Sequence, residues 1–208
     1  MTTDCTIIGR SSSTFTRVVR IFAAELGVST QLEIVRDLGS LEIANYGGNP
    51  ALKVPSMRTA NATWFGALNI CRELFRISRR DLHIVWPESL DQPLLANMQE
   101  LVLHALATEV ALIMSNLPGE PTDTRQRAKL ASSLRNTLAW LDAHSPQALG
   151  ALAEERDLSY LEVCLFCLVT HLEFRQVLPT APYPALVSFC QHFGTRPSSA
   201  QTVFLFDA

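Results

Sequence analysis

The segment Asn49–Met57, Asn-Pro-Ala-Leu-Lys-Val-Pro-Ser-Met, places the strongest constraint on how this chain can fold. Its second proline, Pro55, lies between a loop and an apolar, strand-like run. Proline has no backbone N–H to give to a sheet, so within strands it is confined to edges, first positions and bulges. Pro55 is therefore either an ordinary loop residue or a backbone device such as a cis bond in a tight turn.

The composition describes a globular chain of one or two domains. Of its 208 residues, 48% are apolar and 18% are charged, which is typical of proteins that bury a core. The net charge of -3 and the scattered arginines argue against nucleic acid and anionic membranes as partners. No window approaches the ~20 apolar residues of a membrane span, and residues 1–4 do not begin a secretory signal. We therefore expect a cytoplasmic protein.

The cysteines support a reducing environment. There are five of them, and an odd, widely scattered set indicates free thiols rather than a disulfide framework. Cys164-x-x-Cys167 has the spacing of a redox or zinc motif, but it lies within the strongly apolar run 160–172 and no second ligand pair accompanies it. We interpret both as buried helix thiols and predict no metal site.

The first third of the chain alternates strand-like and helix-like patterns. Apolar runs at 5–8 and 32–35 flank residues 14–26, whose apolar side chains recur at helical spacing before Gly27. Strand, helix and strand over this length predict a right-handed βαβ unit with parallel strands. Further strands are predicted at 52–57 and 63–65, a weak helical turn at 41–46 and a helix at 66–75.

The rest of the chain has a helical pattern. Prolines and charged residues mark a connector at 79–92, and beyond Pro93 no strand pattern stands out. Helices are predicted at 93–116, 122–143, 158–176 and 184–193. The predicted organisation is an α/β domain at 1–78, a linker at 79–92 and an all-α domain at 93–208.

Ser159 and Glu162 stand at the spacing of a capping box at the start of the third of these helices. In that motif each side chain accepts a hydrogen bond from a backbone N–H of the first turn. Leu158 and Val163 stand at the positions of a hydrophobic staple. A capped and nearly all-apolar helix is expected at the centre of the helical domain.

Four segments in the right order resemble the glutathione S-transferase family. They are residues 8–20 (strand, loop and Arg-rich helix), Asn49–Pro55 (Asn-Pro-x-x-Lys-Val-Pro), the cap at 159–162, and the Arg-Pro pair in Thr195–Ser198. The resemblance implies an N-terminal thioredoxin-like βαβ-ββα domain followed by an all-helical domain, assembled as a cytosolic homodimer. It also implies that Val54-Pro55 is a cis bond.

The resemblance implies a glutathione site around this proline. The backbone of Val54, positioned by Pro55, would pair with the cysteinyl backbone of glutathione, and Lys53 would reach the glycyl carboxylate or remain a solvated loop lysine. The family holds the γ-glutamyl carboxylate with an acid-Ser pair at a helix start. The matching positions here are Gly66 and Ala67, so only backbone N–H groups can bind an anion there.

Ser13 aligns with the family's residue that contacts the glutathione sulfur. A hydroxyl donor near a helix N-terminus stabilises a thiolate, so Ser13 is the candidate catalytic residue, with Ser11 and Ser12 as substitutes. The competing interpretation is that these serines are helix-capping residues. A serine provides no thiol for mixed-disulfide chemistry.

The electrophile pocket is expected to include Arg10, Met98, His104 and Thr108. The simpler interpretations are a surface arginine for Arg10 and a core or interface histidine for His104. The predicted function is conjugation of glutathione, as co-substrate and without a cofactor, to a hydrophobic electrophile. The alternatives are a non-catalytic scaffold or regulatory module that has lost glutathione, and a site for another small acidic ligand.

Overall fold

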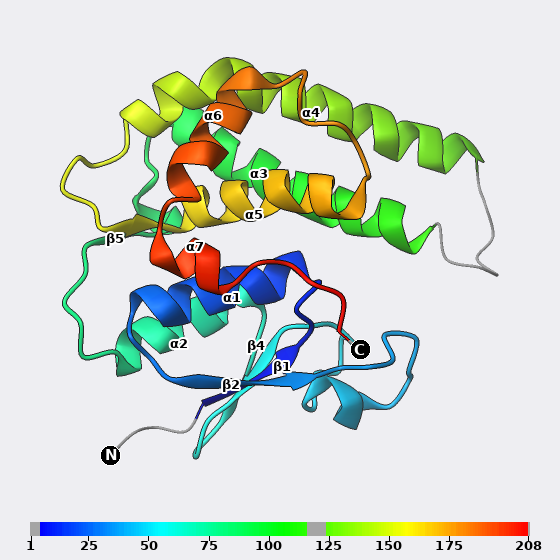
Figure 1. Ribbon diagram of the computed structural model, residues 1–208, viewed down its shortest axis with the longest axis vertical. Coiled ribbons are helices and arrows are strands. Elements are labelled where there is room, and N and C mark those ends of the chain that lie inside the picture. The colour runs from blue at the N-terminus through cyan, green and yellow to red at the C-terminus, as the bar shows by residue number, and fades with distance from the viewer. Residues whose placement is uncertain (1–4, 116–123, 208) are drawn as a thin grey trace. The chain divides into compact units, whose positions relative to one another are not determined.

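The computed structural model describes residues 5–115 and 124–207. The chain divides into two compact units, one formed by residues up to Leu82 together with those from Thr195 onward, and one by His83–Gly194 (Figure 1). The boundaries differ from the predicted 1–78, 79–92 and 93–208. The end of the chain belongs to the first unit, and most of the predicted linker belongs to the second.

The first unit is built on a four-stranded sheet of order β2-β1-β3-β4. β1 pairs in parallel with β2 and antiparallel with β3, and β4 pairs antiparallel with β3. This is the predicted thioredoxin-like βαβ-ββα order. The elements are β1 (Cys5–Gly9), α1 (Thr14–Glu25), β2 (Thr30–Ile34), the 3-10 helix η1 (Ile43–Tyr46), β3 (Ser56–Arg58), β4 (Thr63–Phe65), α2 (Ala67–Ile77) and α7 (Pro197–Gln201).

α1 follows its apolar pattern closely. Val18, Ile21 and Phe22 are fully buried, which is the outcome expected for residues on one stripe of an amphipathic helix. The helix ends before Gly27, whose φ of 64° lies in the left-handed region that favours glycine.

The third strand is shorter than predicted, because it begins at Ser56 rather than at residue 52. Residues 49–55 form a loop that the side chain of Asn49 holds together. Its amide nitrogen donates to the Lys53 carbonyl at 2.8 Å, and its amide oxygen accepts from the Ala51 N–H at 3.0 Å. A side chain that bonds its own backbone in this way competes with a strand ladder.

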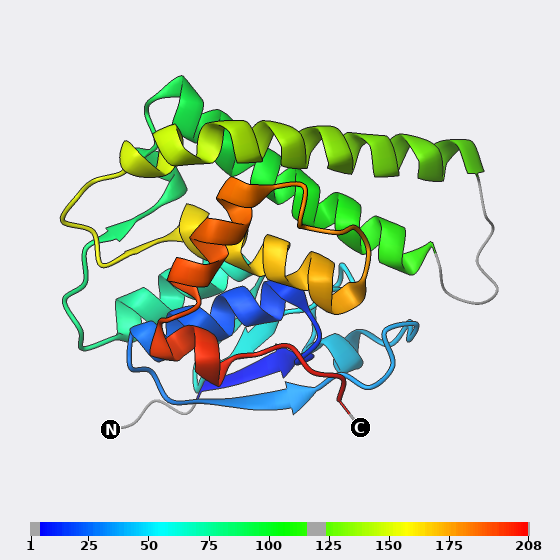
Figure 2. The same ribbon diagram turned by 45° about the horizontal axis from the view of Figure 1, so that its top comes forward.

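The second unit consists of helices and one short two-stranded sheet. Its elements are β5 (Ile84–Val85), the 3-10 helix η2 (Pro87–Ser89), α3 (Pro93–Met114), α4 (Thr124–Gly150), β6 (Leu158–Ser159), α5 (Tyr160–Arg175) and α6 (Pro184–Phe193). The parallel pair β5 and β6 was not predicted, since two-residue strands leave no pattern. The predicted helix limits at residues 116 and 122 lie outside the described residues. Figure 2 shows α3 and α4 running side by side.

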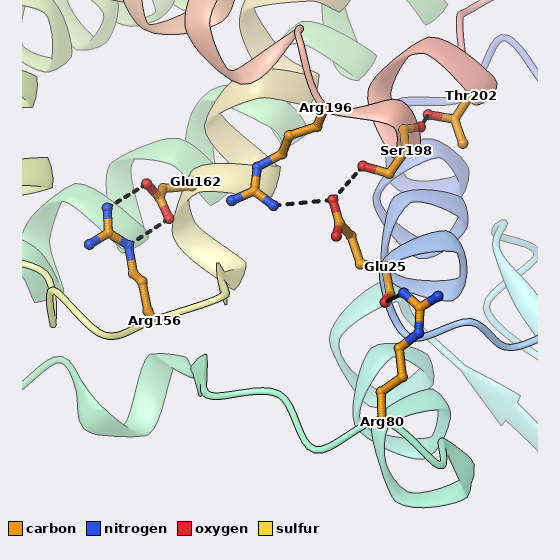
Figure 3. Close-up of polar contacts among 7 residues, drawn as sticks. All are labelled: Glu25, Arg80, Arg156, Glu162, Arg196, Ser198 and Thr202. Atoms are coloured by element: carbon orange, nitrogen blue, oxygen red, sulfur yellow. Dashed lines mark hydrogen bonds and ion pairs between the residues drawn. The ribbon is translucent and has the colours of Figure 1, made fainter.

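The prediction of a capping box at the start of α5 is wrong. Ser159 occupies the N-cap position, but its side chain makes no capping hydrogen bond. Glu162 instead receives two hydrogen bonds from the Arg156 guanidinium, at 2.7 and 2.9 Å (Figure 3). A charge-assisted, two-point contact of this kind is stronger than a neutral cap bond. The Glu162 carboxylate therefore binds the Arg156 guanidinium instead of a backbone N–H at the start of α5.

α5 is buried along nearly its whole length, as predicted. Cys164 and Cys167 are fully buried, and burial raises the pKa of the Cys164 thiol well above its ordinary value. In the described ranges, no group of three metal-ligating side chains comes together. No helix within residues 5–115 and 124–207 is both long and apolar enough to cross a membrane.

Candidate functional site

One edge of the four-stranded sheet gathers the segments that the sequence singled out. In the β1–β3 pair Ile8 lies opposite Ser56, and in the β3–β4 pair Ser56 lies opposite Phe65. β1 and β4 therefore end, and β3 begins, at the same edge. The loop 10–13, the turn 53–55 and the start of α2 at Gly66 all meet there.

The turn before β3 presents its backbone at this edge. The Val54-Pro55 peptide bond is cis, and the Pro55 carbonyl accepts from the Gly66 N–H at 3.3 Å. The side chain of Val54 packs against the buried cluster of Ile8, Val35 and Tyr46. Within residues 5–115 and 124–207, neither the N–H nor the C=O of Val54 is hydrogen-bonded. Packing thus fixes Val54 while its backbone groups are left for another partner.

Ser13 is the N-cap residue of α1. Its backbone is extended, and its hydroxyl oxygen accepts from the Thr16 N–H at 3.3 Å. A hydroxyl has one donor besides its acceptor positions, so capping leaves the Ser13 proton available for a further bond. The capping interpretation and the catalytic one are therefore compatible. Ser11 and Ser12 are each only 7% exposed.

Thr14, which the sequence did not single out, supplies a second hydroxyl at the same helix start. It is the first residue of α1 and is 1% exposed. Its hydroxyl has no hydrogen-bond partner among the described residues. Only the pattern Ser-Thr at a helix start could have drawn attention to it, and that pattern is common at helix caps.

The start of α2 has backbone but no polar side chains to offer. Gly66 is its N-cap with φ 82°, it gives no side-chain cap, and the first turn holds no acidic residue. A Cβ built on Gly66 would meet no atom within 4 Å, so the space beside it is open. Ala67 is 7% exposed. Lys53 is exposed on the adjoining turn.

The end of the chain reaches the loop before α1. The Ser11 N–H donates to the Asp207 carboxylate at 2.9 Å, and the Arg10 Nε lies 3.8 Å from the same oxygen. The Arg10 guanidinium also donates to the Arg36 carbonyl at 3.4 Å. Sequence reasoning missed Asp207, because a contact between residues so distant along the chain leaves no local pattern.

The arginines of α1 face the same C-terminal segment. Arg17, 5% exposed, donates to the Ser199 carbonyl at 3.3 Å and lies 4.3 Å from the centre of the Phe204 ring. Arg20 donates to the Gln201 carbonyl at 3.5 Å. Burial lowers the pKa of Arg20, and the charge of Asp207 acts in the opposite direction. Figures 1 and 2 both show the segment after α7 running beside α1.

The electrophile-pocket residues of the second unit do not form one surface. Met98 is fully buried in α3. His104 is exposed and pairs with Glu100 at 3.7 Å. It lines a shallow groove of about 260 Å³ together with Trp140 of α4, whereas Thr108 and Met98 do not line this groove. Arg10 belongs to the other unit and lies in the loop before α1.

Comparison with solved structures finds the same architecture in glutathione transferases. A glutathione transferase family member from Pseudomonas fluorescens, solved with bound glutathione, matches 97% of this chain over 99% of its own at 18% identity and a TM-score of 0.79. A glutathione S-transferase from Methylobacillus flagellatus with glutathione bound matches 97% over 100% at 19% identity and 0.74. One from Sinorhizobium meliloti matches 95% over 91% at 20% identity and 0.69.

Comparisons by sequence, in contrast, find no significant match. No protein-family model matches the chain. No curated protein matches it significantly in sequence. At these identities the structural matches establish the fold, and the predicted resemblance is confirmed at that level. The chain therefore has the glutathione transferase fold, with a thioredoxin-like unit and a helical unit.

Proposed function

We propose that this protein binds glutathione at the edge formed by Ser13, Val54 and Gly66, and conjugates it to a hydrophobic electrophile. The observation that carries the proposal is the backbone of Val54, which is held by core packing and has no hydrogen bond within the described chain. An extended peptide pairs with such a backbone as an added strand would. The solved relatives named above hold glutathione.

The proposed chemistry needs a donor for a thiolate. A thiol with a pKa near 8.5 is mostly protonated at neutral pH. The Ser13 hydroxyl lies at the N-terminal end of α1, where its proton and the helix dipole both favour a negative sulfur. A hydrogen bond to a charged group contributes about 1.5–3 kcal/mol, which corresponds to roughly one to two pKa units. No general base is required.

Calorimetry with reduced glutathione tests binding, and the pH dependence of thiolate absorbance in the complex tests the role of Ser13. Ser13→Asp retains a good N-cap but replaces the donor with a negative charge, so the apparent thiol pKa should rise by at least about one unit. Thr14→Val removes the neighbouring hydroxyl without touching the cap and shows whether that group contributes. Absence of glutathione binding to the parent protein would overturn the proposal.

The second candidate is a non-catalytic module with this fold. The start of α2 favours it, since Gly66 and Ala67 provide no side-chain grip for the γ-glutamyl carboxylate. Ala67→Ser adds one hydroxyl at this position. If glutathione is a ligand, the variant should bind it more tightly, by about threefold to tenfold for one added hydrogen bond. If neither form binds glutathione, the non-catalytic module is favoured.

The remaining features of the proposal concern location and assembly. We infer a cytoplasmic homodimer, with the electrophile held against the helical unit. The odd and widely scattered set of five cysteines supports a reducing compartment. Light scattering measures the assembly state, and a monomer at all concentrations would contradict the homodimer.

A further inference from the structure

The Asp207 carboxylate is an acidic group bound to the loop 10–13, one of the segments that form the candidate site. Its side chain is 9% exposed, although it stands next to the end of the chain. Its oxygen accepts the Ser11 N–H at 2.9 Å, in the loop that leads directly into Ser13 and α1. The Ser11 N–H belongs to the loop two residues before the N-cap Ser13, and it holds the carboxylate as it could hold an anionic ligand.

The contact leaves a donor unused. The Arg10 Nε is 3.8 Å from Asp207, too far for a hydrogen bond. This nitrogen is buried and has no hydrogen-bond partner among the described residues. Asp207 therefore satisfies the Ser11 N–H but not the arginine. An anion that reached both donors would be bound better than the carboxylate already there.

The segment that carries Asp207 is firmly anchored where it leaves α7. Ser198 and Thr202 are at most 5% exposed, and the Ser198 hydroxyl donates to Glu25 at 2.6 Å (Figure 3). Beyond Thr202, Phe204 packs on Arg17, but three neighbouring apolar side chains are about half exposed or more. These are Val203 at 53%, Leu205 at 46% and Phe206 at 63%. At these three positions, displacing the segment therefore uncovers little buried apolar surface.

We propose that Arg10 and the Ser11 N–H form an anion-binding corner of the candidate site, and that Asp207 is its built-in, displaceable occupant. A ligand with a carboxylate or sulfonate at this end of the site binds by expelling the C-terminal strap, residues 203–207. The strap thus lowers the affinity of the site for acidic ligands. The identity of the ligand rests on the proposed function, whereas the corner and its occupant do not.

The corner is tested first with a simple oxyanion. The full-length protein is labelled with ¹⁵N, and the Ser11 amide resonance is followed during titration with sodium sulfate at constant ionic strength. Asp207→Ala should bind sulfate about tenfold more tightly than the parent, and Asp207→Asn should lie between them, since each removes a charged competitor. Asp81→Asn removes an exposed carboxylate of the same unit and should match the parent. Equal affinity in all forms, or no response at Ser11, overturns the proposal.

A second titration links the corner to the ligand site. Reduced glutathione is compared with glutathione sulfonate, which carries an additional anion at its sulfur end. Asp207→Ala should improve glutathione sulfonate binding about tenfold and reduced glutathione binding less. An equal gain for both compounds, or none for either, overturns the claim that the strap competes with acidic ligands. If no form binds either compound, the proposed function fails, and the sulfate titration alone decides on the corner.

Discussion

Glu109 of α3 and His171 of α5 form a buried polar pair, and removal of one member alone should strongly destabilise the protein. The Glu109 carboxylate is 0% and the His171 ring 3% exposed, with 2.9 Å between Oε1 and Nδ1. At this distance and an effective dielectric constant near 20, the attraction between full charges is about 6 kcal/mol. Moving two charged groups out of water costs several kcal/mol each. The pair therefore contributes little net stability, but either member alone is costly.

The expected consequence is strong coupling between two substitutions. His171→Leu should lower the free energy of unfolding by about 3–5 kcal/mol, because it leaves the Glu109 carboxyl group buried without its partner. Glu109→Leu combined with His171→Leu should recover most of that loss, since both polar groups are replaced by apolar ones. Urea unfolding followed by far-UV circular dichroism measures the differences, provided that the m value is unchanged.

The exposed pair of Glu100 and His104 on the same helix is the matched control. Both side chains are about two-thirds exposed, with 3.7 Å between Oε1 of Glu100 and Nε2 of His104, so His104→Leu should change the unfolding free energy by less than about 1 kcal/mol. The reasoning is refuted if His171→Leu has an equally small effect. It is refuted as well if the double variant is as unstable as the sum of its single substitutions.

Glu109 also makes the stability of the protein depend on pH, and the direction follows from its raised pKa. Burial raises the pKa of Glu109 above its ordinary value of 4.5, although His171 and Arg175 oppose the shift. The folded protein then holds the proton to higher pH than the unfolded chain. The contribution of this group to stability is complete below about pH 4.5 and is lost as the pH rises through the folded pKa. Relative to Glu109→Gln, the parent should lose stability across this range. An identical slope in both would contradict the assignment.

Three further predictions concern single contacts. Arg156→Lys cannot form the two-point contact with Glu162 at 2.7 and 2.9 Å and should lower the unfolding free energy by about 1–2 kcal/mol; an unchanged urea midpoint would contradict this. The Cys164 thiol, fully buried and with a pKa raised by burial, should be alkylated only as the chain unfolds, and mass spectrometry detecting its modification in the native protein would refute its inertness. Gly9→Ala places a Cβ 2.5 Å from the Thr16 hydroxyl oxygen and should lower the stability measured by thermal unfolding by about 1–3 kcal/mol. If Gly9→Ala causes the same loss of stability in a protein that also carries Thr16→Ala, this clash is not the cause.

The helices and the order of the main strands could be predicted because their signals are local. Apolar residues at helical spacing located α1 and α3, and Gly27 located the end of α1. The prediction failed at the start of α5, where one side chain had two possible hydrogen-bond partners. Glu162 stands at the right spacing for a capping box, but it bonds Arg156, which lies before the helix on a loop. The choice between a backbone N–H and a guanidinium depends on how the loop folds.

The candidate site could be predicted in its backbone parts and not in its tertiary contacts. Val54 and Gly66 follow from strand ends, so pattern and order along the chain locate them. Asp207 meets Ser11 only because α7 is anchored on α1, through Glu25 and its partners. No local sequence pattern around Asp207 predicts such a contact. The segment Asn49–Met57 predicted a backbone to which a ligand could bind, but nothing in it predicted that Asp207 would lie in the neighbouring loop.

A site made mainly of backbone groups explains how the fold can persist at such low sequence identity. The position of Val54 depends on packing against Ile8 and Tyr46, and buried positions of this kind accept any apolar residue of suitable volume. Side chains that grip a ligand have no such tolerance, and at Gly66 and Ala67 the chain has none. Charge recognition therefore falls to the loop before α1, where the Asp207 side-chain carboxylate already accepts the Ser11 N–H. Ligand preference in this protein should accordingly change more with substitutions at residue 207 than with substitutions in the turn before β3.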